Sequence, residues 1–596
     1  MSDRFDDILG ATAPVVVAPS GVGGEMAGGA FDGADRFDSA LAMWQPQLAS
    51  ADADIIPDKP ISDARARDML RNDAYVQGGA TLHKDNIVGS QYVLNAKPAS
   101  RIIFGKVDDA WESEFQEEVE ELFDLASESP DNLFDASRMN TFTGLVRLAV
   151  GINVAGGEVL AAAEWIRNGR PFNTAIQMIE AERLSTPPLN LLNSNIRGGV
   201  EKHPVYNYPI AYHIRSVHPN DYLPTFQNFT DMWDWKRIEL RKPWGRIQII
   251  HLFEQMRPAQ TRGIAAMVAA LKEMRITRKF RDVSLQRAVT QALYAATITS
   301  ERPPAEAYQM RGAGSGGVPT ADEVEAASNN FITGYMRTIG KFAGGAKNLQ
   351  ADGVKFPWLP PGTKLDMVSP VNSSPLGMEF EQSLLRYIAA TLNVSYEQLS
   401  RDYTSTNYSS ARAAMAETWK AMSSIKKTIA DRFATMIYRL WLEEMINQDR
   451  LKSFPASKAP LLYENGALGF RFDAISRCSW IGASRGQIDE LKETQAAVLR
   501  INNGLSTMED EIARLGGDWR KNLRQVAREK AMIKKLEAEG GITLFNTSGS
   551  SAMTNATEGG AKPTNEPAAD GEGARSVGTA EKLFLDCTYP DEEADK

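Results

Sequence analysis

The feature that most constrains this chain is a regularly spaced stripe of mostly apolar residues in its last third. Between residues 411 and 446, eight positions follow the 3-4-3-4-4-3-4 spacing of a single helix face: Met415, Thr418, Met422, Ile425, Ile429, Phe433, Met436 and Leu440. Such a stripe packs either within the chain or between copies of it. The spacing therefore predicts one long helix against which other elements must pack.

A polar loop precedes this helix. The stretch SRDYTSTNYSSAR at 400–412 is nearly free of aliphatic side chains, yet it follows a second strongly helical segment at 376–394. Helix–helix connections usually take about two to eight residues, and longer polar loops tend to carry function. The loop is therefore a candidate functional site, with a plain surface connector as the alternative. Its candidate residues are Arg401, Asp402, Tyr403, Thr404, Ser405, Thr406, Asn407 and Tyr408.

The remaining segments indicate an α+β fold. Residues 108–128 predict an acidic helix with one apolar face. Turn residues separate strand-like stretches at 158–166, 207–217 and 246–253. The predicted apolar face of the acidic helix consists of Trp111, Phe115, Val119 and Leu122.

Two later segments contrast in composition. Residues 302–375 are rich in Gly and Pro, whereas 485–538 predict a helical hairpin. Within that hairpin, Ser506 and Glu509 have the S-x-x-E spacing of a capping box, in which each residue satisfies a backbone N–H at the start of a helix.

The segment RARDMLRNDAYVQGGATLHKDNIVGS at 65–90 also predicts a helix, capped by Ser62 and ended by Gly89 in a left-handed conformation. Its internal Gly78 and Gly79 each cost about 1 kcal/mol relative to alanine, so they need a structural reason. The basic residues of this segment are expected to form a solvated face; they are Arg65, Arg67, Arg71 and Lys84.

Composition excludes several classes of protein. A chain of 596 residues is too long for one core and suggests three or four structural units. Its net charge of −10 argues against tight wrapping of nucleic acid, but not against a protein that lets DNA slide past. It has no apolar run of about 18 residues and no basic leader before its N-terminal apolar patch, so neither a membrane span nor a signal peptide is expected. The only cysteines, Cys478 and Cys587, suggest a reducing compartment.

The sequence contains no motif that predicts a catalytic, metal-binding or phosphate-binding site. The histidines do not occur in an H-E-x-x-H zinc motif, although His251 and Glu254 lie three apart. GAGSGG at 312–317 lacks the Gly-Lys-Ser/Thr of a phosphate loop, and there is no G-x-S-x-G nucleophile elbow. We therefore expect no catalytic residues, no metal site and no cofactor.

One basic cluster stands out in the predicted helix after residue 263. Five cations within ten residues either form a solvated face or meet an anionic partner. The cluster consists of Lys272, Arg275, Arg278, Lys279 and Arg281.

Taken together, four stretches resemble the lambda-type portal proteins of tailed bacteriophages. They are the 65–90 segment, IIHLFEQMRPAQTRGI, VSPVNSSPLGMEFEQSLLRYIAATLNVSYEQLSRDYTSTNYSSARAA and QAAVLRINNGLSTMEDEIARLGGDW. Each motif alone is weak, but their order is specific, and the resemblance extends from about residue 60 to 538.

The resemblance implies a portal fold with a wing, a two-helix stem, a clip, a tunnel loop with a long kinked helix, and a helical crown. It also suggests that the glycines of the 65–90 segment allow close helix packing, and leaves open that its arginines pair with a neighbouring subunit near Glu117–Glu121. The implied segments are a flexible N-terminus (1–58), the first part of the wing (59–261), the first stem helix (262–289), the clip (290–373), the second stem helix (374–399), the tunnel loop (400–410), the kinked helix (411–446), the wing return (447–484), the crown (485–540) and a disordered tail (541–596).

For function, the resemblance implies a homo-oligomeric ring, twelve-fold in the virion, at one capsid vertex. Double-stranded DNA would enter through it during packaging and leave through it later. Implied partners are other copies of the chain, the terminase large subunit, the major capsid and scaffold proteins, and head–tail connector proteins. Localisation would be the virion, after assembly in the host cytoplasm. The alternatives are a head scaffolding or adaptor protein, or a head-associated hydrolase.

Overall fold

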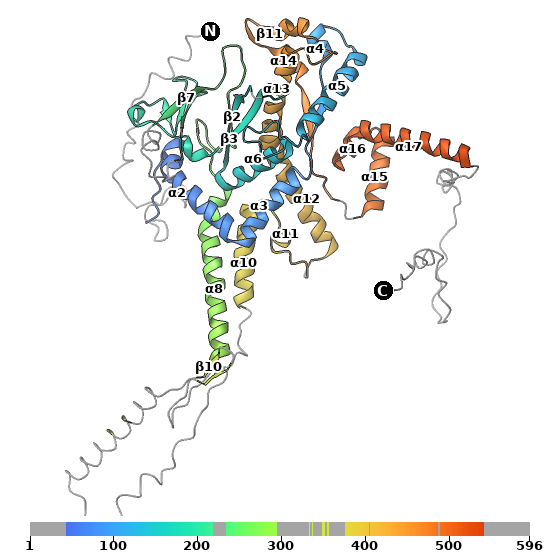
Figure 1. Cartoon of the computed structure of the whole chain (residues 1–596). Coiled ribbons are helices and arrows are strands. Elements are labelled where there is room, and N and C mark those ends of the chain that lie inside the picture. Colours follow the sequence, from blue (N-terminus) through green and yellow to red (C-terminus); the bar gives the residue numbers. More distant parts are fainter. Residues whose placement is uncertain are drawn as a thin grey trace, which may run out of the picture. The chain divides into compact units, whose positions relative to one another are not determined.

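The computed structural model describes most of the chain between residues 43 and 540 (Figure 1). Contacts divide the chain into two units, 1–519 and 520–596. The described residues of the second unit belong to one helix, α17 (Trp519–Gly540). The tail from 541 and the GAGSGG stretch lie outside the described residues, which are 43–167, 169–218, 234–294, 333, 337, 349–351, 354–356, 376–404, 406–486 and 489–540.

The expected helix at 65–90 is in fact two helices, α2 (Ala51–Asn72) and α3 (Ala74–Ile87). The Asp73 side chain accepts hydrogen bonds from the backbone N–H groups of Tyr75 and Val76, at 3.0 and 3.1 Å. Aspartate is a preferred N-cap because it satisfies donors that have no partner within the helix, so the chain restarts a helix at this point.

Two expectations about the N-terminal part are wrong. Ser50, not Ser62, caps α2, through a 3.3 Å hydrogen bond from the N–H of Ala53. Residues 51–58 are therefore helical rather than flexible. Trp44 is 69% exposed and does not anchor this segment.

The glycines of α3 have different roles. A Cβ on Gly79 would lie 2.7 Å from Leu392 Cδ1, whereas one on Gly78 would meet nothing within 4 Å. The close-packing hypothesis is therefore confirmed for Gly79 alone. Gly89 has φ +76°, the left-handed conformation expected of a helix terminator.

Two antiparallel sheets form most of the β structure, in strand orders β3-β2-β8 and β4-β5-β6-β7. The three strands expected from sequence are present as β2, β6 and β8, and their buried residues join the two apolar cores. The strand bounds are β1 (Val93–Ala96), β2 (Glu158–Trp165), β3 (Thr174–Ile179), β4 (Ile196–Arg197), β5 (Val200–Lys202), β6 (Pro209–Arg215), β7 (Trp235–Glu239), β8 (Ile249–Phe253), β9 (Leu349–Ala351), β10 (Val354–Phe356), β11 (Tyr463–Glu464), β12 (Ala467–Leu468) and β13 (Cys478–Ile481).

The long helix is confirmed, and it is the centre of the main core. It comprises α12 (Tyr408–Ile425), a π-helical turn η7 (Lys426–Ala430) and α13 (Asp431–Asn447). The expected stripe is a packing surface, since five of its eight members are buried. The acidic helix is also confirmed as α5 (Asp109–Ser127), whose buried Phe123 meets two aromatic rings of α13.

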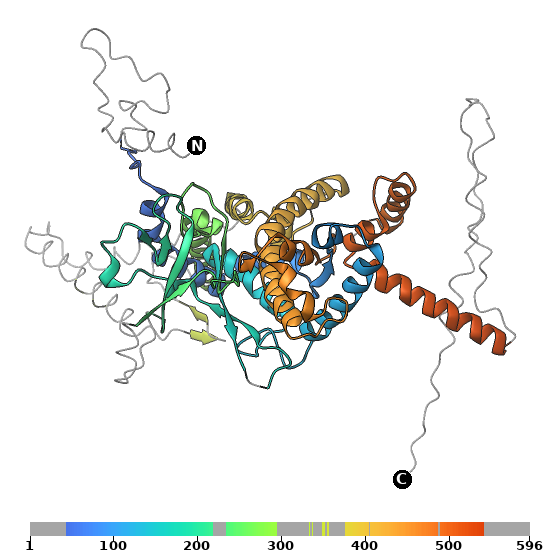
Figure 2. The same ribbon diagram turned by 90° about the horizontal axis from the view of Figure 1, so that it is seen from above.

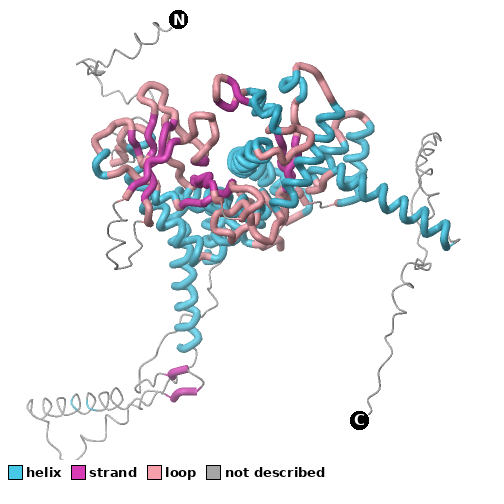
Figure 3. The backbone as a smooth tube through the Cα atoms, turned by 45° about the horizontal axis from the view of Figure 1, so that its top comes forward, coloured by secondary structure: helices cyan, strands magenta, loops and turns pink. Residues whose placement is uncertain are grey.

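Helix α13 lies between strands β2 and β3 on one side and α5 on the other (Figures 1 and 2). A second apolar helix, α6 (Phe142–Gly156), packs beneath these strands and against α3. Figure 3 shows the strands of the large unit in magenta and the helices around them in cyan.

Two neighbouring helices extend away from this core in Figure 1: α8 (Leu271–Tyr294) and α10 (Leu376–Thr391). The first expected stem helix therefore starts at 271, not 262, because 3₁₀ helix η4 (Ala266–Ala270) precedes it. The second expected stem helix is interrupted after Thr391, and α11 (Tyr396–Ser400) follows as a separate helix. Of the expected clip, the structure describes the end of α8, the antiparallel pair β9–β10 and a few single residues.

The expected crown hairpin contains three helices: α15 (Glu490–Asn502), α16 (Met508–Arg514) and α17. The predicted capping box at Ser506 is wrong by one residue. Thr507 is the N-cap and accepts a hydrogen bond from the N–H of Asp510, while Glu509 instead pairs with Lys97 of the wing segment at 2.9 Å. The remaining short helices are α4 (Ser100–Phe104), α14 (Phe470–Ile475), η2 (Ala181–Arg183), η3 (Pro188–Asn190) and η8 (Ala456–Leu462).

Candidate functional site

The candidate loop is shorter than expected, because helices extend into both of its ends. α11 ends at Ser400 and α12 begins at Tyr408, so the connection covers residues 401–407. We call these seven residues the polar loop. Arg401 turns the chain out of α11 with φ +57°, and the Asn407 side chain caps α12 by accepting a 2.9 Å hydrogen bond from the N–H of Ser410.

Within the polar loop, side chains bond mainly to their own backbone. Asp402 accepts hydrogen bonds from the N–H and hydroxyl of Thr404, at 3.1 and 2.6 Å, and these bonds lower the pKa of its carboxyl group. Asp402 is therefore held as a carboxylate by Thr404. Tyr403 is 55% exposed, and Tyr408, at the first position of α12, is 52% exposed. Ser405 lies outside the described residues.

Both ends of the polar loop are fixed by buried contacts. Leu399 of α11 is buried against Gly79 of α3, and the Thr418 hydroxyl of α12 donates to Gln398 Oε1 at 3.0 Å. His83 of α3 lies 2.7 Å from the carbonyl oxygen of Leu392, and burial lowers the pKa of its imidazole. A rigid frame therefore presents a short, exposed, polar connection.

The π-helical turn in the long helix is held by charge. Lys426 Nζ donates to Asp431 Oδ1 and to the carbonyl oxygen of Trp480, each at 2.9 Å. Tyr92 also donates to Asp431, and the Lys426 ammonium lies 5.3 Å from the centre of the Tyr92 ring. These contacts fix the widened turn against β1 and β13.

The five cations of the expected basic cluster differ in burial and in pairing. Arg281 is half-buried: it donates to Glu381 of α10 at 2.7 Å, lies 3.9 Å from Asp73 and covers the ring of Tyr75. It is therefore part of the packing between α8, α10 and α3. The other four members have no ion pair with any residue in the described ranges, and three of them are exposed; the four are Lys272, Arg275, Arg278 and Lys279.

Sequence reasoning missed a buried charge cluster before α8. Glu158, fully buried at the start of β2, accepts hydrogen bonds from Arg262 at 2.6 and 3.0 Å and lies 3.3 Å from Lys59 of α2. Burial alone would raise the pKa of Glu158, but Arg262, His251 and Lys59 outweigh that effect and hold it well below its ordinary value. Asp63, 3.0 Å from Lys59, completes what we call the Glu158 cluster.

Glu158 and Arg262 are 104 residues apart in the chain, so no local sequence pattern predicts their contact. The one available signal is the pair Arg262-Gly263, which sequence reasoning read as the start of a helix. The backbone N–H of Gly263 in fact donates to Glu158 at 2.9 Å. Arg262 also donates to the carbonyl oxygens of Leu184 and Ala181, which fixes the segment that leads into α8.

Among the described residues, one group has ligand atoms close enough to hold a metal ion: Glu180, Glu182 and His218. Arg67 already donates to Glu182 at 2.8 Å and lies 3.8 Å from Glu180. The arginine therefore already engages both carboxylates within the chain and offsets part of their charge. Arg67 thus has partners within its own chain, whereas the sequence left open a partner in the neighbouring subunit. Across the same ranges, no helix is both long and apolar enough to span a membrane.

Comparisons with known proteins complete this description. A family model described as phage portal protein, lambda family, matches residues 37–426. Portal protein B of Escherichia phage lambda is 33% identical over 521 residues, covering 87% of this chain and 92% of that protein. The portal protein of Escherichia phage N15 is 34% identical over 502 residues, covering 84% of this chain and 89% of that protein.

Solved structures with similarity to this chain come from gene transfer agent (GTA) particles. A chain from the neck of an empty GTA particle computed with C6 symmetry has 13% sequence identity and a TM-score of 0.37, covering 80% of this chain and 96% of that chain. A chain from the virion of the native GTA particle has the same identity and TM-score, with 80% and 94% covered.

Proposed function

Because the chain belongs to the lambda family of phage portal proteins, we propose that its copies form a ring at one capsid vertex and that DNA passes through the ring. Membership of this family gives the chain a structural rather than a catalytic role, in an oligomeric ring that assembles with capsid components of the virion. The ring is proposed to be twelve-fold, assembled in the host cytoplasm.

In this proposal residues 59–261 and 447–484 form the wing, with α8 and α10 as the stem and the residues between them as the clip. The polar loop is the tunnel loop, α12 to α13 is the long helix, and residues 485–540 form the crown. Double-stranded DNA, the terminase large subunit, scaffold proteins and head–tail connector proteins are the proposed partners. The exposed cations of α8 are proposed to meet an anionic surface of the capsid or of packaged DNA.

The observation that carries the tunnel-loop assignment is the fixed frame around the polar loop. Its described residues include exposed hydroxyl, amide and phenol groups beside the charged Arg401 and Asp402, while contacts of Gly79 and Gln398 hold both ends. Such groups exchange hydrogen bonds with water and phosphate at nearly equal energy, each worth about 1 kcal/mol net. A channel lined in this way neither holds DNA tightly nor repels it strongly.

A deletion tests this role. Asn407 caps α12, so the deletion should spare it and remove only Thr404, Ser405 and Thr406. We expect rings in negative-stain images of the purified variant, because the flanking helices remain anchored. DNA packaging, or retention of full-length DNA, should fail in heads made with it.

The matched control replaces the same three residues by Gly-Ser-Gly and so keeps the length of the loop. Packaging by the control but not by the deletion variant would show that the reach of the loop matters. Wild-type retention of genomes by the deletion variant would contradict the assignment, and a wild-type chain without rings would contradict the proposed function itself.

A further inference from the structure

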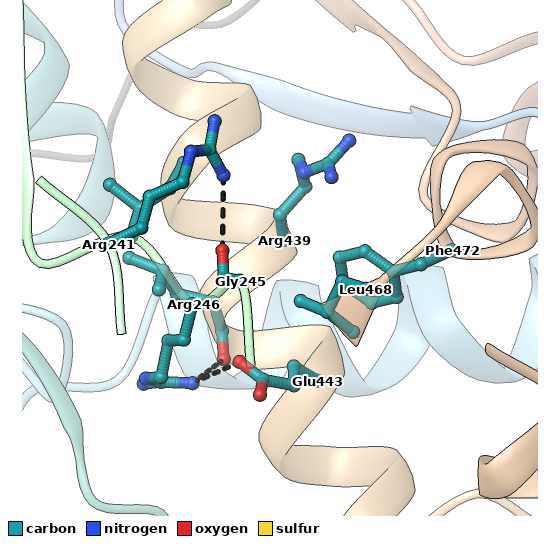
Figure 4. Close-up of a pocket in the computed structure, with 9 residues that line it drawn as sticks. Arg241, Gly245, Arg246, Arg439, Glu443, Leu468 and Phe472 are labelled. Carbon is teal, nitrogen blue, oxygen red and sulfur yellow. Dashed lines mark hydrogen bonds and ion pairs between the residues drawn. The ribbon is translucent and has the colours of Figure 1, made fainter. Parts of the chain in front are cut away.

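A cavity of about 390 Å³ lies beside the π-helical turn, between α13, β13 and the segment that joins β7 to β8. Four cations line it: Arg241, Lys427, Arg432 and Arg439. We call this surface the cationic groove. Figure 4 shows an adjoining pocket that shares Arg241 and Arg439 with the groove; the two side chains come from different segments.

The charges of the cationic groove are not balanced within the described chain. Its two carboxylates are already engaged: Asp473 pairs with Arg439 at 2.6 Å, and Asp431 pairs with Lys426 at 2.9 Å. Arg241 donates to the carbonyl oxygen of Gly245, and desolvation together with the neighbouring Arg439 lowers its pKa.

No residue that the structure describes forms an ion pair with Arg241, Lys427 or Arg432. These three side chains are exposed and line the same cavity, and like charges placed together repel one another unless an anion joins them. The groove therefore fits an anionic partner.

The shape of the groove favours carboxylate side chains over DNA. A cavity of this volume admits a few side chains but not a duplex, whose major groove alone is about 12 Å wide. Met436 and Trp480 also line the groove, and they would pack against the methylene groups of glutamate side chains.

The chain itself carries a complementary surface. Helix α5 has no basic residue, and its exposed side presents Glu114, Glu117 and Glu121, which lie three and four residues apart. The opposite side of α5 is buried through Phe115 and Phe123. We call the three glutamates the acidic face.

The acidic face and the cationic groove lie on opposite sides of α13. The groove is lined by Arg432, Met436 and Arg439, which share one side of that helix, at i, i+4 and i+7. Phe123 of α5 instead contacts Tyr438 and Trp441, about half a turn away. A surface and its complement on opposite sides of one subunit make a head-to-tail contact, which closes into a ring when the rotation between copies allows it.

We propose that the cationic groove of one copy receives the acidic face of α5 from the next copy, so that each interface is completed by glutamates of the neighbour. The inference rests on the ring of the proposed function and adds the surface that holds it. Arg432 and Arg439 are seven residues apart, as are Glu114 and Glu121. Seven residues of helix rise about 10.5 Å, so the two rows of charge match in length.

Charge exchange between two chains tests the proposal. The first variant carries Lys427→Glu and Arg432→Glu, which remove no ion pair between described residues. The second carries Glu117→Lys and Glu121→Lys. We expect both to keep the helical circular dichroism of the wild type and to lose the ring in light scattering and negative-stain images. Mixed one to one, they should form rings again, and only rings with an even number of subunits, because each groove then accepts only the other variant.

A control variant with Arg65→Glu and Arg71→Glu makes the same change of charge on the exposed face of α2 and should still form rings. Rings from the first variant alone, or no rings from the mixture, would overturn the proposal while leaving the portal function standing. Loss of rings in the control but not in the first variant would assign the contact to α2 instead. If a variant lost its helical signal, a single chain carrying all four groove and α5 substitutions should recover rings, and its failure would also overturn the proposal.

Discussion

The Glu158 cluster and the basic cluster of α8 are both dense in charge, and Arg262 of the first lies ten residues before Lys272 of the second, yet their charges are paired differently. In the first, Glu158 meets Arg262 and Lys59 from other segments, and Asp63 meets Lys59 within α2. In the second, only Arg281 forms an ion pair with another described residue, while Lys272 and Arg275 are exposed.

This contrast separates charges that stabilise one subunit from charges that remain for assembly. Buried charges must be satisfied within the chain, because their desolvation cost exceeds what an unpaired group can recover. Exposed cations cost little and remain available to an anionic surface. The cationic groove is intermediate: Arg439 pairs with Asp473, whereas Arg241, Lys427 and Arg432 are exposed and form no ion pair with a described residue.

The largest expected effect is the loss of a buried partner. Arg262→Met should leave Glu158 buried without its main counter-charge and should also free the carbonyl oxygens of Leu184 and Ala181. Breaking a buried pair from one side costs about 3–5 kcal/mol. Hydrogen exchange should show that the amides of β2 and β8 lose protection.

The matched control replaces both partners, Glu158→Gln with Arg262→Met, and should recover part of the loss because no unpaired charge remains. Equal protection in the single variant and the wild type would mean that the cluster contributes nothing to the fold, and the contrast with α8 would disappear.

A smaller effect concerns Asp63, whose pKa is raised by burial from its ordinary 3.8 to about 6. The folded chain keeps this proton over a pH range in which the unfolded chain has released it. Stability of the wild type should therefore fall as pH rises from about 4 to about 6, by about 2–3 kcal/mol for a shift of roughly two units.

Asp63→Asn removes this titration and should flatten that part of the profile, while Lys59 keeps Glu158 as a partner. The measurement is the midpoint of thermal unfolding at pH 4, 5, 6 and 8 for both proteins. Parallel profiles for the two proteins would show that Asp63 ionises normally in the folded chain.

The smallest effect lies within the basic cluster itself. Arg281→Gln removes its bond to Glu381 and should cost about 1–2 kcal/mol, because the lost partner is a half-buried charge. Lys279→Gln, two residues away and exposed, should change stability by no more than about 0.5 kcal/mol. Thermal unfolding of the two variants side by side measures the difference.

The effects of these residues on function should follow the reverse order of their effects on stability. A variant in which glutamate replaces Lys272, Arg275 and Lys279, with Arg281 kept, should fold normally but give a lower yield of filled heads. If heads formed normally, these three cations would be only a solvated face. Similar destabilisation by Arg281→Gln and Lys279→Gln would remove the division within the cluster.

Much of the fold could be predicted because periodicity is local. The stripe from Met415 to Leu440 and the apolar face of α5 follow directly from residue spacing, and packing enforces both. The boundaries were harder, because they depend on single caps. Asp73 restarts a helix within 65–90, Asn407 moves the end of the polar loop, and Thr507 caps α16 although the adjacent Ser506 fits the same pattern.

The candidate site was predictable only in part. Sequence alone selects a polar loop between two strong helices, but it cannot show that Asp402 bonds to Thr404 or that Arg281 is held by Glu381. The Glu158 cluster joins distant segments, so no spacing of residues in the sequence predicts that Glu158 and Arg262 meet. A weak signal of the π-helical turn was present, since the two consecutive four-residue steps from Ile425 through Ile429 to Phe433 lie across it.

That turn sets the direction in which the polar loop points. A π-helical turn closes on five residues where an α-helical turn closes on four, so η7 accommodates one residue more than a regular helix would. Each α-helical residue advances about 100° around the axis. In a regular helix one added residue would therefore swing α12 and the loop about 100° relative to α13, whereas the π-helical turn absorbs it. A lineage that lost one residue between Lys426 and Ala430 would replace the turn by a regular one and keep the direction of its loop.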